Sequence, residues 1–288
     1  MAPTAGISFK PIHFEAAVAA PAAGLWFEVH PENYMVAGGP RLNMLEALRA
    51  ARPLSLHGVG LSLAGAERPD HAHLERLKRL CDRFAPVLVS EHLAWSRSET
   101  RCFPDLLPFP RTTEALLRIV RNIDLVQNRL GRQILIENPS LYVALDGHDW
   151  RETDFLQQLV KRTGCRLLVD VNNVAVSANN LGFDAFAYLD ALPADAIGEI
   201  HLAGHRPDPE HGRALLIDSH DVPVAEGVWR LYRHLIGRTG PVPTLIERDG
   251  NIPAFAELIA ERDRAAAILR TPVVPVQSHR RPRLAACA

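Results

Sequence analysis

Short runs of apolar residues alternate along most of this chain with longer segments whose apolar positions recur every three or four residues. The short runs are rich in Val, Leu and Ile, which is typical of strands buried on both faces. The longer segments have the periodicity of amphipathic helices. Such an alternation predicts a parallel sheet covered by helices.

Eight of the apolar runs are candidate strands, and residues 6–9 lead into the first: 25–30, 54–58, 87–92, 133–137, 166–170, 197–202, 215–218 and 243–247. The helical patterns cover 42–51, 71–84, 113–130, 153–163, 183–192, 224–236 and 253–269. One uninterrupted series of this kind favours a single closed (β/α)8 barrel over residues 1–270. The Pro- and Arg-rich segment 271–288 is predicted to be disordered.

Composition narrows the class of protein. A hydrophobic fraction of 47% and a charged fraction of 23% are ordinary for a globular chain, and the net charge of -1 argues against a broad nucleic-acid-binding surface. No apolar stretch is long enough for a membrane span, and residues 1–10 do not have the pattern of a signal peptide. The four cysteines form no C-x-x-C pair, so we expect reduced thiols and a cytoplasmic protein.

The candidate strands share one feature, which is that they end in residues able to bind metals. From the second strand to the eighth these are His57, His92, Glu137, Asp170, His201, the Asp218-x-His220 pair and Glu247. The carboxyl ends of parallel barrel strands meet at one face. Bringing so many carboxylates and imidazoles together is costly unless cations neutralise them. Mixed nitrogen and oxygen ligands favour iron, zinc or manganese.

Each residue alone has a simpler explanation. A single acidic residue at a strand end is more often a helix N-cap or one half of an ion pair, and Glu28 in the first strand is assigned to that class. Asn138, Asn172 and Asn173 follow strands, where they either fix turns or take part in the site. The simple explanation does not account for the same residue types at six successive strand ends, so the sequence predicts a metal centre.

The order of these residues resembles the ligand order of the endonuclease IV and xylose isomerase-like barrels. By that resemblance His57, His92 and Glu137 hold a first metal, and Glu137 bridges to a second. The second metal is held by Glu137, Asp170, His201 and Glu247. A third position combines Asp218 and His220 with Asn173, where such barrels often have His. Because an amide oxygen is a weaker ligand than imidazole, we expect the third metal to be loose or absent.

The local motifs resemble a narrower family, the multinuclear non-haem iron-dependent oxidative enzymes. They include His-Gly-Val-Gly-Leu-Ser (57–62), Ser-Glu-His-Leu (90–93), Ile-Glu-Asn-Pro-Ser (136–140), Asp-Val-Asn-Asn-Val (170–174), Glu-Ile-His-Leu-Ala-Gly-His (199–205), Ile-Asp-Ser-His-Asp (217–221) and Ile-Glu-Arg-Asp-Gly-Asn-Ile-Pro (246–253). The family includes the methanobactin-maturing oxygenase and the bufferin-modifying enzymes. The resemblance covers residues 6–270. Arg248 and Ala175 stand where the family commonly has Trp and Tyr, which bears on substrate fit more than on metal binding.

The resemblance implies oxidation of a cysteine in a ribosomally synthesised precursor peptide. The cofactors implied are two or three iron ions in mixed Fe(II)/Fe(III) states, with dioxygen as co-substrate, and a separate partner protein recognises the leader peptide. His205 lies outside the ligand set and is either an acid/base group, a substrate contact or a residue that orders its loop. Asn138 and Asn172 complete the candidate catalytic residues.

Three other functions are possible for such a barrel. A phosphodiesterase or endonuclease IV-like hydrolase needs basic loops at the site, for which Arg97 and Arg101 are the candidates. A sugar isomerase usually has a catalytic lysine beside the metals, and Lys10 alone lies outside the predicted outer helices. A non-catalytic metal-binding protein does not need so many ligands for open metal positions.

Overall fold

The computed structural model describes residues 4–98 and 101–271. Eight parallel strands close into a barrel in the order β1, β12, β9, β8, β7, β4, β3, β2. Their bounds are β1 Ala5–Ser8, β2 Phe27–Val29, β3 Leu54–Gly58, β4 Leu88–His92, β7 Leu135–Glu137, β8 Arg166–Asp170, β9 Ile197–Leu202 and β12 Thr244–Ile246. The predicted (β/α)8 barrel is therefore confirmed.

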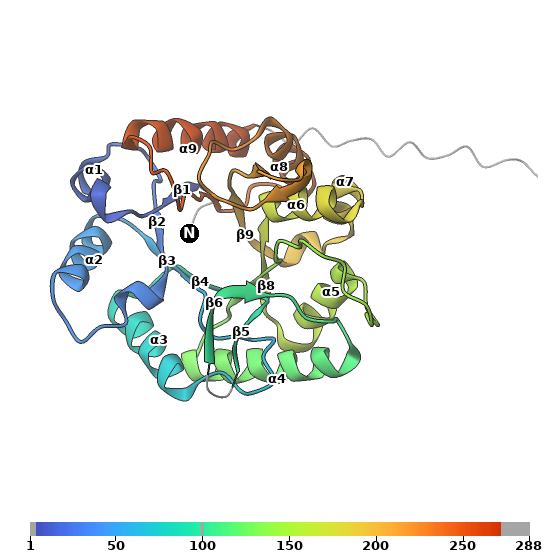
Figure 1. Ribbon diagram of the computed structural model, residues 1–288. Coiled ribbons are helices and arrows are strands. Elements are labelled where there is room, and N and C mark those ends of the chain that lie inside the picture. Colours follow the sequence, from blue (N-terminus) through green and yellow to red (C-terminus); the bar gives the residue numbers. More distant parts are fainter. Residues whose placement is uncertain (1–3, 99–100, 272–288) are drawn as a thin grey trace, which may run out of the picture.

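Helices form a ring around the barrel (Figure 1). They are α1 Phe14–Ala19, α2 Pro40–Ala51, α3 His71–Phe84, α4 Thr113–Leu130, α5 Glu152–Thr163, α6 Val171–Leu181, α7 Ala185–Ala191, α8 Glu226–Thr239 and α9 Phe255–Arg270, with short 3-10 turns at Pro11–His13, Pro31–Tyr34 and Ala194–Ala196. Helix α4 illustrates how local sequence determines where a helix begins and ends. The Thr112 side chain accepts a hydrogen bond from the Ala115 backbone N–H at its start, and Gly131 adopts a left-handed conformation at its end.

Two of the strands that form the barrel differ from those predicted. Residues 5–8, expected only to lead into the first strand, form β1 and pair with both β2 and β12. The predicted strand 215–218 belongs instead to β11 (Gly212–Ile217), which pairs antiparallel with β10 (Arg206–Asp208) outside the barrel. Its apolar residues Leu215, Leu216 and Ile217 are only half-buried, so the run of hydrophobic residues did not distinguish β11 from a core strand.

A second hairpin stands over the same end of the barrel. Strands β5 (Trp95–Ser98) and β6 (Arg101–Leu107) pair antiparallel between β4 and α4. Most of the segment 102–110 belongs to β6, and the Trp95 indole N–H donates to the Pro108 carbonyl at 2.8 Å. Both hairpins therefore rise from the face at which the strands end.

The strands and the inner faces of the helices form one continuous apolar core. Its largest fully buried side chains include Trp26, Trp229, Tyr232, Phe27 and Phe155. Burying a side chain of this size contributes about 1.5–3 kcal/mol, so this core supports the polar residues at the strand ends. The buried Cys81 and Cys165 and the exposed Cys102 are free thiols, as expected, while Cys287 and residues 272–288 of the predicted tail lie outside the described residues. Within the described ranges, no helix has the length and apolar character needed to cross a membrane.

Candidate metal centre

The structure brings six of the predicted metal ligands together at the carboxyl ends of the barrel strands. We call this group the inner ring, and it consists of His57, His92, Glu137, Asp170, His201 and Glu247. Strand register puts its members level with one another, because His92 pairs with Glu137 and Asp170 pairs with His201 on neighbouring strands. All are buried except His92, whose side chain is 14% exposed.

The first predicted metal position has its three ligands in place. The Nε2 atoms of His57 and His92 lie 3.1 and 2.9 Å from Oε2 of Glu137. Behind them, His92 Nδ1 lies 2.8 Å from the Gly58 carbonyl, and His57 Nδ1 lies 2.8 Å from the Ser90 hydroxyl. The carbonyl can only accept, so Nδ1 of His92 carries a hydrogen, which leaves Nε2 as the nitrogen that would bind a metal. This is the arrangement of a metal-binding histidine.

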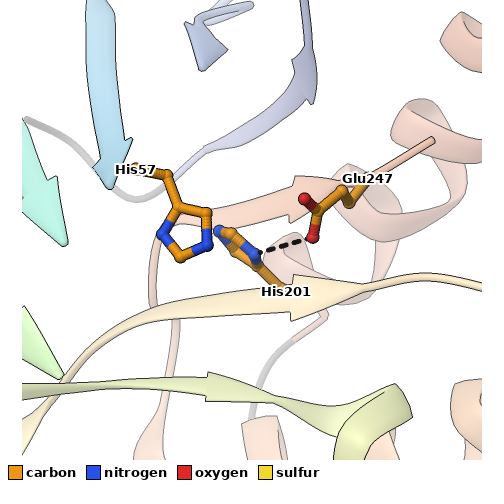
Figure 2. Close-up of side chains that lie close together, drawn as sticks. All are labelled: His57, His201 and Glu247. Atoms are coloured by element: carbon orange, nitrogen blue, oxygen red, sulfur yellow. Dashed lines mark hydrogen bonds and ion pairs between the residues drawn. The ribbon is translucent and has the colours of Figure 1, made fainter. Parts of the chain in front are cut away.

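The second predicted position shares a ligand with the first. Three of its four ligands, Glu137, Asp170 and His201, have ligand atoms within 4.8 Å of one another. The fourth, Glu247, lies within the same distance of His201 and His57. Figure 2 shows His57, His201 and Glu247, with His201 Nδ1 3.2 Å from Oε2 of Glu247. Since Glu137 belongs to both positions, its carboxylate can bridge two metals.

Several buried atoms of the inner ring fit a cation better than they fit each other. Oε2 of Glu137, Oδ2 of Asp170 and Nε2 of His201 have no hydrogen-bond partner among the described residues. The Glu137 oxygen lies close to two imidazole nitrogens, yet none of these contacts has hydrogen-bond alignment. Asp170 Oδ1 caps α6 by accepting from the Asn173 N–H at 2.7 Å, which leaves Oδ2 for another partner. Buried polar groups without partners are rare. Metals at the inner ring would satisfy the two carboxylate oxygens, whereas Nε2 of His201 faces Glu28.

The close approach of these buried charged groups also shifts their pKa values. Burial alone would raise the pKa of Glu137, but His92 and His57 hold that pKa well below its usual range. Burial alone would lower the pKa of His92, but Glu137 raises it to about 10. Burial and the nearby Asp218 raise the pKa of Asp170 well above its usual value. Without metal, protons therefore take the places that cations would occupy.

The predicted third position is more open. His220 Nε2 lies 2.7 Å from Asp218 Oδ1, and both residues line the same cavity as Asn173. The amide nitrogen of Asn173 donates to the Asn138 carbonyl at 3.0 Å, and its Oδ1 is buried without a hydrogen-bond partner among the described residues. The amide oxygen is thus available as a ligand, although the hydrogen bonds of Asn173 do not join it to the other two residues.

A strained loop holds His220 in place. Its backbone is left-handed, with φ of 48°, and its N–H donates to the Gly204 carbonyl at 2.9 Å. A side chain at Gly204 would put a Cβ 2.1 Å from the Val222 carbonyl oxygen, so only glycine allows this approach. The His220 ring then turns Nδ1 toward Glu247 and Asp249, at 3.4 Å from each. We call Asp218, His220 and Asp249 the outer ring.

The three candidate catalytic residues have different surroundings. Asn138 makes two hydrogen bonds to the backbone of Asp170, donating to its carbonyl at 3.1 Å and accepting from its N–H at 3.0 Å. Asn172 donates to Asp218 Oδ1 at 2.6 Å and accepts from Nδ1 of His205 at 2.7 Å. This bond places the His205 hydrogen on Nδ1 and leaves Nε2 as an acceptor. Burial lowers the pKa of His205.

Sequence reasoning missed two groups around the inner ring. His30 forms a possible ligand group with Glu247 and Asp249, and its Nδ1 lies 3.0 Å from the His57 carbonyl. It ends the first predicted strand, so the rule used for the other strands would have found it. Glu28, assigned to the class of N-caps and ion-pair members, does lie at ion-pair distance from His201, and it stands beneath the centre together with Glu199. Their positions inside strands gave no comparable signal.

A cavity of about 300 Å³ opens over the rings, and Leu106 of β6, Pro139, Tyr142 and Ser219 form part of its wall. His92, Glu137, His220 and Glu247 lie along the same cavity. A volume of this size admits a side chain and adjacent backbone, not a folded domain. The centre is therefore accessible from the face where the two hairpins stand.

Comparison with known proteins agrees with this picture. Residues 4–270 match the family model of the RiPP precursor modification enzyme MbnB/TglH/ChrH. A UPF0276 protein of Caulobacter vibrioides (strain NA1000 / CB15N) is 64% identical over 269 residues, covering 93% of this chain and 96% of that protein. Another from Bordetella bronchiseptica is 54% identical over 266 residues, covering 92% of each.

Solved structures share the fold at low identity. Endonuclease IV from Thermus thermophilus superposes with a TM-score of 0.58 at 16% identity, covering 93% of this chain and 98% of that one. D-psicose 3-epimerase from Clostridium cellulolyticum gives 0.57 at 12% identity, with 92% and 96% covered. The IOLI protein, solved with a zinc atom, gives 0.58 at 10% identity, with 92% and 98% covered. These similarities identify a xylose isomerase-like barrel.

Proposed function

This chain belongs to the MbnB/TglH/ChrH family of RiPP precursor modification enzymes, and from that premise we propose that it oxidises a cysteine of a ribosomally synthesised peptide with iron and dioxygen. The observation that carries the proposal is the shared carboxylate of Glu137, which belongs to two groups of residues that could hold a metal beneath an open cavity. These residues would hold two metals next to each other, and the metals would supply the oxidative chemistry at the substrate.

The ligand types support iron. Three imidazoles and three carboxylates make up the inner ring, a mixture that suits iron, manganese or zinc. His57, His92 and Glu137 would hold the first iron, and Glu137, Asp170, His201 and Glu247 the second. Asn173, Asp218 and His220 would hold a third, so we propose two or three irons in mixed Fe(II)/Fe(III) states. Bound iron would supply the redox chemistry with dioxygen as the oxidant.

The chain's own side chains would bind the peptide and handle its protons. A cysteine side chain entering the cavity would meet the inner ring directly, and its thiolate is a good ligand for iron. Tyr142 and Leu106 would enclose the adjacent peptide backbone. The Nε2 atom of His205, left as an acceptor by the bond between Nδ1 and Asn172, is suited to take up a proton at the edge of the site.

We assign recognition of the leader peptide to a separate partner protein. The described residues form one barrel and two short hairpins, and both hairpins are part of the site's surroundings. The partner would deliver the precursor, and the cavity would receive only the residue to be modified. The expected cytoplasmic location remains a prediction.

The competing functions find less support around the cavity. Arg97, a candidate phosphate contact for a nuclease, forms an ion pair with Asp70 at 3.0 Å. Lys10, a candidate isomerase base, lies near the centre but pairs with Asp249 at 2.7 Å. Similarity to endonuclease IV and to the epimerases extends to the fold alone.

Co-expression of this chain with a cysteine-containing precursor peptide and a leader-recognising partner protein tests the proposal. Mass spectrometry should show an oxidative mass change at the cysteine, dependent on iron and dioxygen and lost in His201→Ala. His201 is the better variant than Asp170→Ala because Asp170 also caps α6. An unchanged peptide with iron-loaded protein, together with cleavage of DNA at abasic sites, would support the nuclease instead.

A further inference from the structure

A cluster of polar side chains lies inside the barrel, directly beneath the inner ring. It consists of Glu28 on β2, Ser55 on β3 and Glu199 on β9, which surround the inner-ring residue His201, and at most 3% of any of these residues is exposed. Buried carboxyl groups are costly unless they are paired, so the cluster calls for an explanation beyond packing. None of the metal positions described above uses Glu28 or Glu199.

His201 connects this cluster to the metal centre. Its Nδ1 faces Glu247, 3.2 Å from Oε2, on the side of the second metal position. Its Nε2 faces the opposite way, 3.3 Å from Oε1 of Glu28 and 3.8 Å from Oε1 of Glu199. An imidazole that binds a metal through one nitrogen carries its hydrogen on the other. If Nδ1 binds the metal, the hydrogen on Nε2 points to the two carboxyl groups.

Of the two, Glu28 is the one held in position to accept that hydrogen. The Ser55 hydroxyl donates to its Oε2 at 2.7 Å, which fixes the carboxylate and turns Oε1 toward His201. Both oxygens of Glu199 lack a hydrogen-bond partner among the described residues, and Glu199 is also the more distant group. The contact from Nε2 to Glu28 has the distance of a hydrogen bond but not its alignment.

We propose that Glu28 is a positioning residue for the second metal, acting through His201. Its carboxylate selects the tautomer in which Nδ1 is free for the metal, and its charge makes the imidazole a stronger ligand. Such carboxylate–histidine–metal units are common, and losing the outer carboxylate typically weakens metal binding by about 10–100-fold. The proposal rests on the proposed function for its metal, and it adds a residue that fixes the geometry of that metal from below.

The test compares Glu28→Gln with Glu199→Gln in the full chain. Both changes keep the shape of a buried side chain and remove one carboxyl group from beside His201. Metal-free protein is titrated with ferrous iron under anaerobic conditions, and Mössbauer spectra are recorded for each variant. We expect Glu28→Gln to weaken one of the iron sites by about 10–100-fold and to change the spectrum of that site. Glu199→Gln should leave both nearly unchanged.

A third variant, Ser55→Ala, distinguishes a specific effect on the iron site from misfolding caused by the loss of a buried charge. Ser55→Ala leaves the carboxylate but removes the group that fixes it, so it should weaken the same site by a smaller factor. Equal iron binding in wild type and Glu28→Gln, or an equal loss in Glu199→Gln, would overturn the proposal. The titration measures iron binding in the absence of peptide and partner. Normal iron sites without peptide oxidation would therefore contradict the proposed function alone, whereas a wild-type chain that binds no iron would contradict both.

Discussion

The inner and outer rings contain the same kinds of side chains but are held by different parts of the fold. Inner-ring residues stand on barrel strands or directly after them, with the apolar core beneath them. Outer-ring residues stand on the loops that follow β11 and β12. Exposure differs most between Glu137, whose side chain is 2% exposed, and Asp249, whose side chain is 38% exposed, whereas His92, Asp218 and His220 are 12–14% exposed.

This difference indicates which metal positions are preformed. Strand pairing fixes His92 against Glu137 and Asp170 against His201, so these ligands need little reorganisation when a metal binds. His220 depends instead on a left-handed backbone and on the contact of its loop with Gly204. We expect two firmly held metals in the inner ring and a weaker, exchangeable one at its junction with the outer ring.

The largest effect should come from Glu137→Ala, which tests whether the inner ring acts as one unit. The substitution removes a ligand from both inner positions and leaves His57 and His92 without their shared partner. Loss of a group that only supports a ligand costs about 10–100-fold, so loss of the bridging ligand should cost more than about 100-fold in peptide oxidation. Iron content should fall by about two ions per chain. Loss of a single iron would contradict a bridging role.

The inner ring was largely predictable from sequence because it follows a simple rule. Each ligand ends an apolar run, and the ends of parallel strands meet at one face, so His57, His92 and Glu137 could be placed together without coordinates. The rule fails inside strands. Whether Glu28 and Glu199 face the barrel axis at the level of His201 depends on register, and register shifts between Leu167 and Leu168 where β8 pairs with β9.

The mouth of the barrel was less predictable. The apolar run of β11 has the composition of a core strand, and only its pairing with β10 shows that it lies outside the barrel. Helix α6 was missed because its asparagines resemble a turn, although Asp170 caps its start and Gly182 ends it. Both elements carry or support outer-ring residues. Local composition decides less there because tertiary contacts determine the conformation.

The next largest effect should be a pH dependence of the free energy of unfolding of the metal-free protein, caused by His92 in the inner ring. Although burial would lower the pKa of His92, Glu137 raises it to about 10, whereas an unfolded histidine titrates near 6.5. The proton therefore stabilises the metal-free fold fully below about pH 6.5, and that contribution is lost as the pH rises toward 10. The free energy of unfolding should decrease by a few kcal/mol across this range.

Thermal or urea unfolding at several pH values measures this decrease. Metal-loaded protein should not show it, because the metal then occupies the place of the proton on His92. The variant His92→Gln, which cannot titrate, provides the control. A decrease of the same size in His92→Gln would show that other groups cause it.

A smaller effect should follow from Asp218→Asn in the outer ring. The amide keeps the shape of the side chain but removes the charge that faces His220. We expect about a tenfold loss of affinity for the third iron, with the two inner irons retained. Asn173→Ala should have the same pattern if its amide oxygen is a ligand. Loss of an inner iron in either variant would show that the two rings are not independent.

The smallest effect should come from Tyr142→Phe, because the Tyr142 side chain contacts the outer ring at the backbone of Asp218. The Tyr142 hydroxyl accepts a hydrogen bond from the Asp218 N–H at 3.1 Å, and a neutral hydrogen bond of this kind contributes about 1 kcal/mol. Removing it should loosen the loop before His220 and weaken the third iron by at most about fivefold. Tyr188→Phe is the matched control, because the Tyr188 hydroxyl donates to Glu152 at 2.6 Å, in neither ring. Iron titration of both variants measures the difference. A larger loss in Tyr142→Phe than in Asp218→Asn would mean that the loop, rather than the carboxylate, determines the third site.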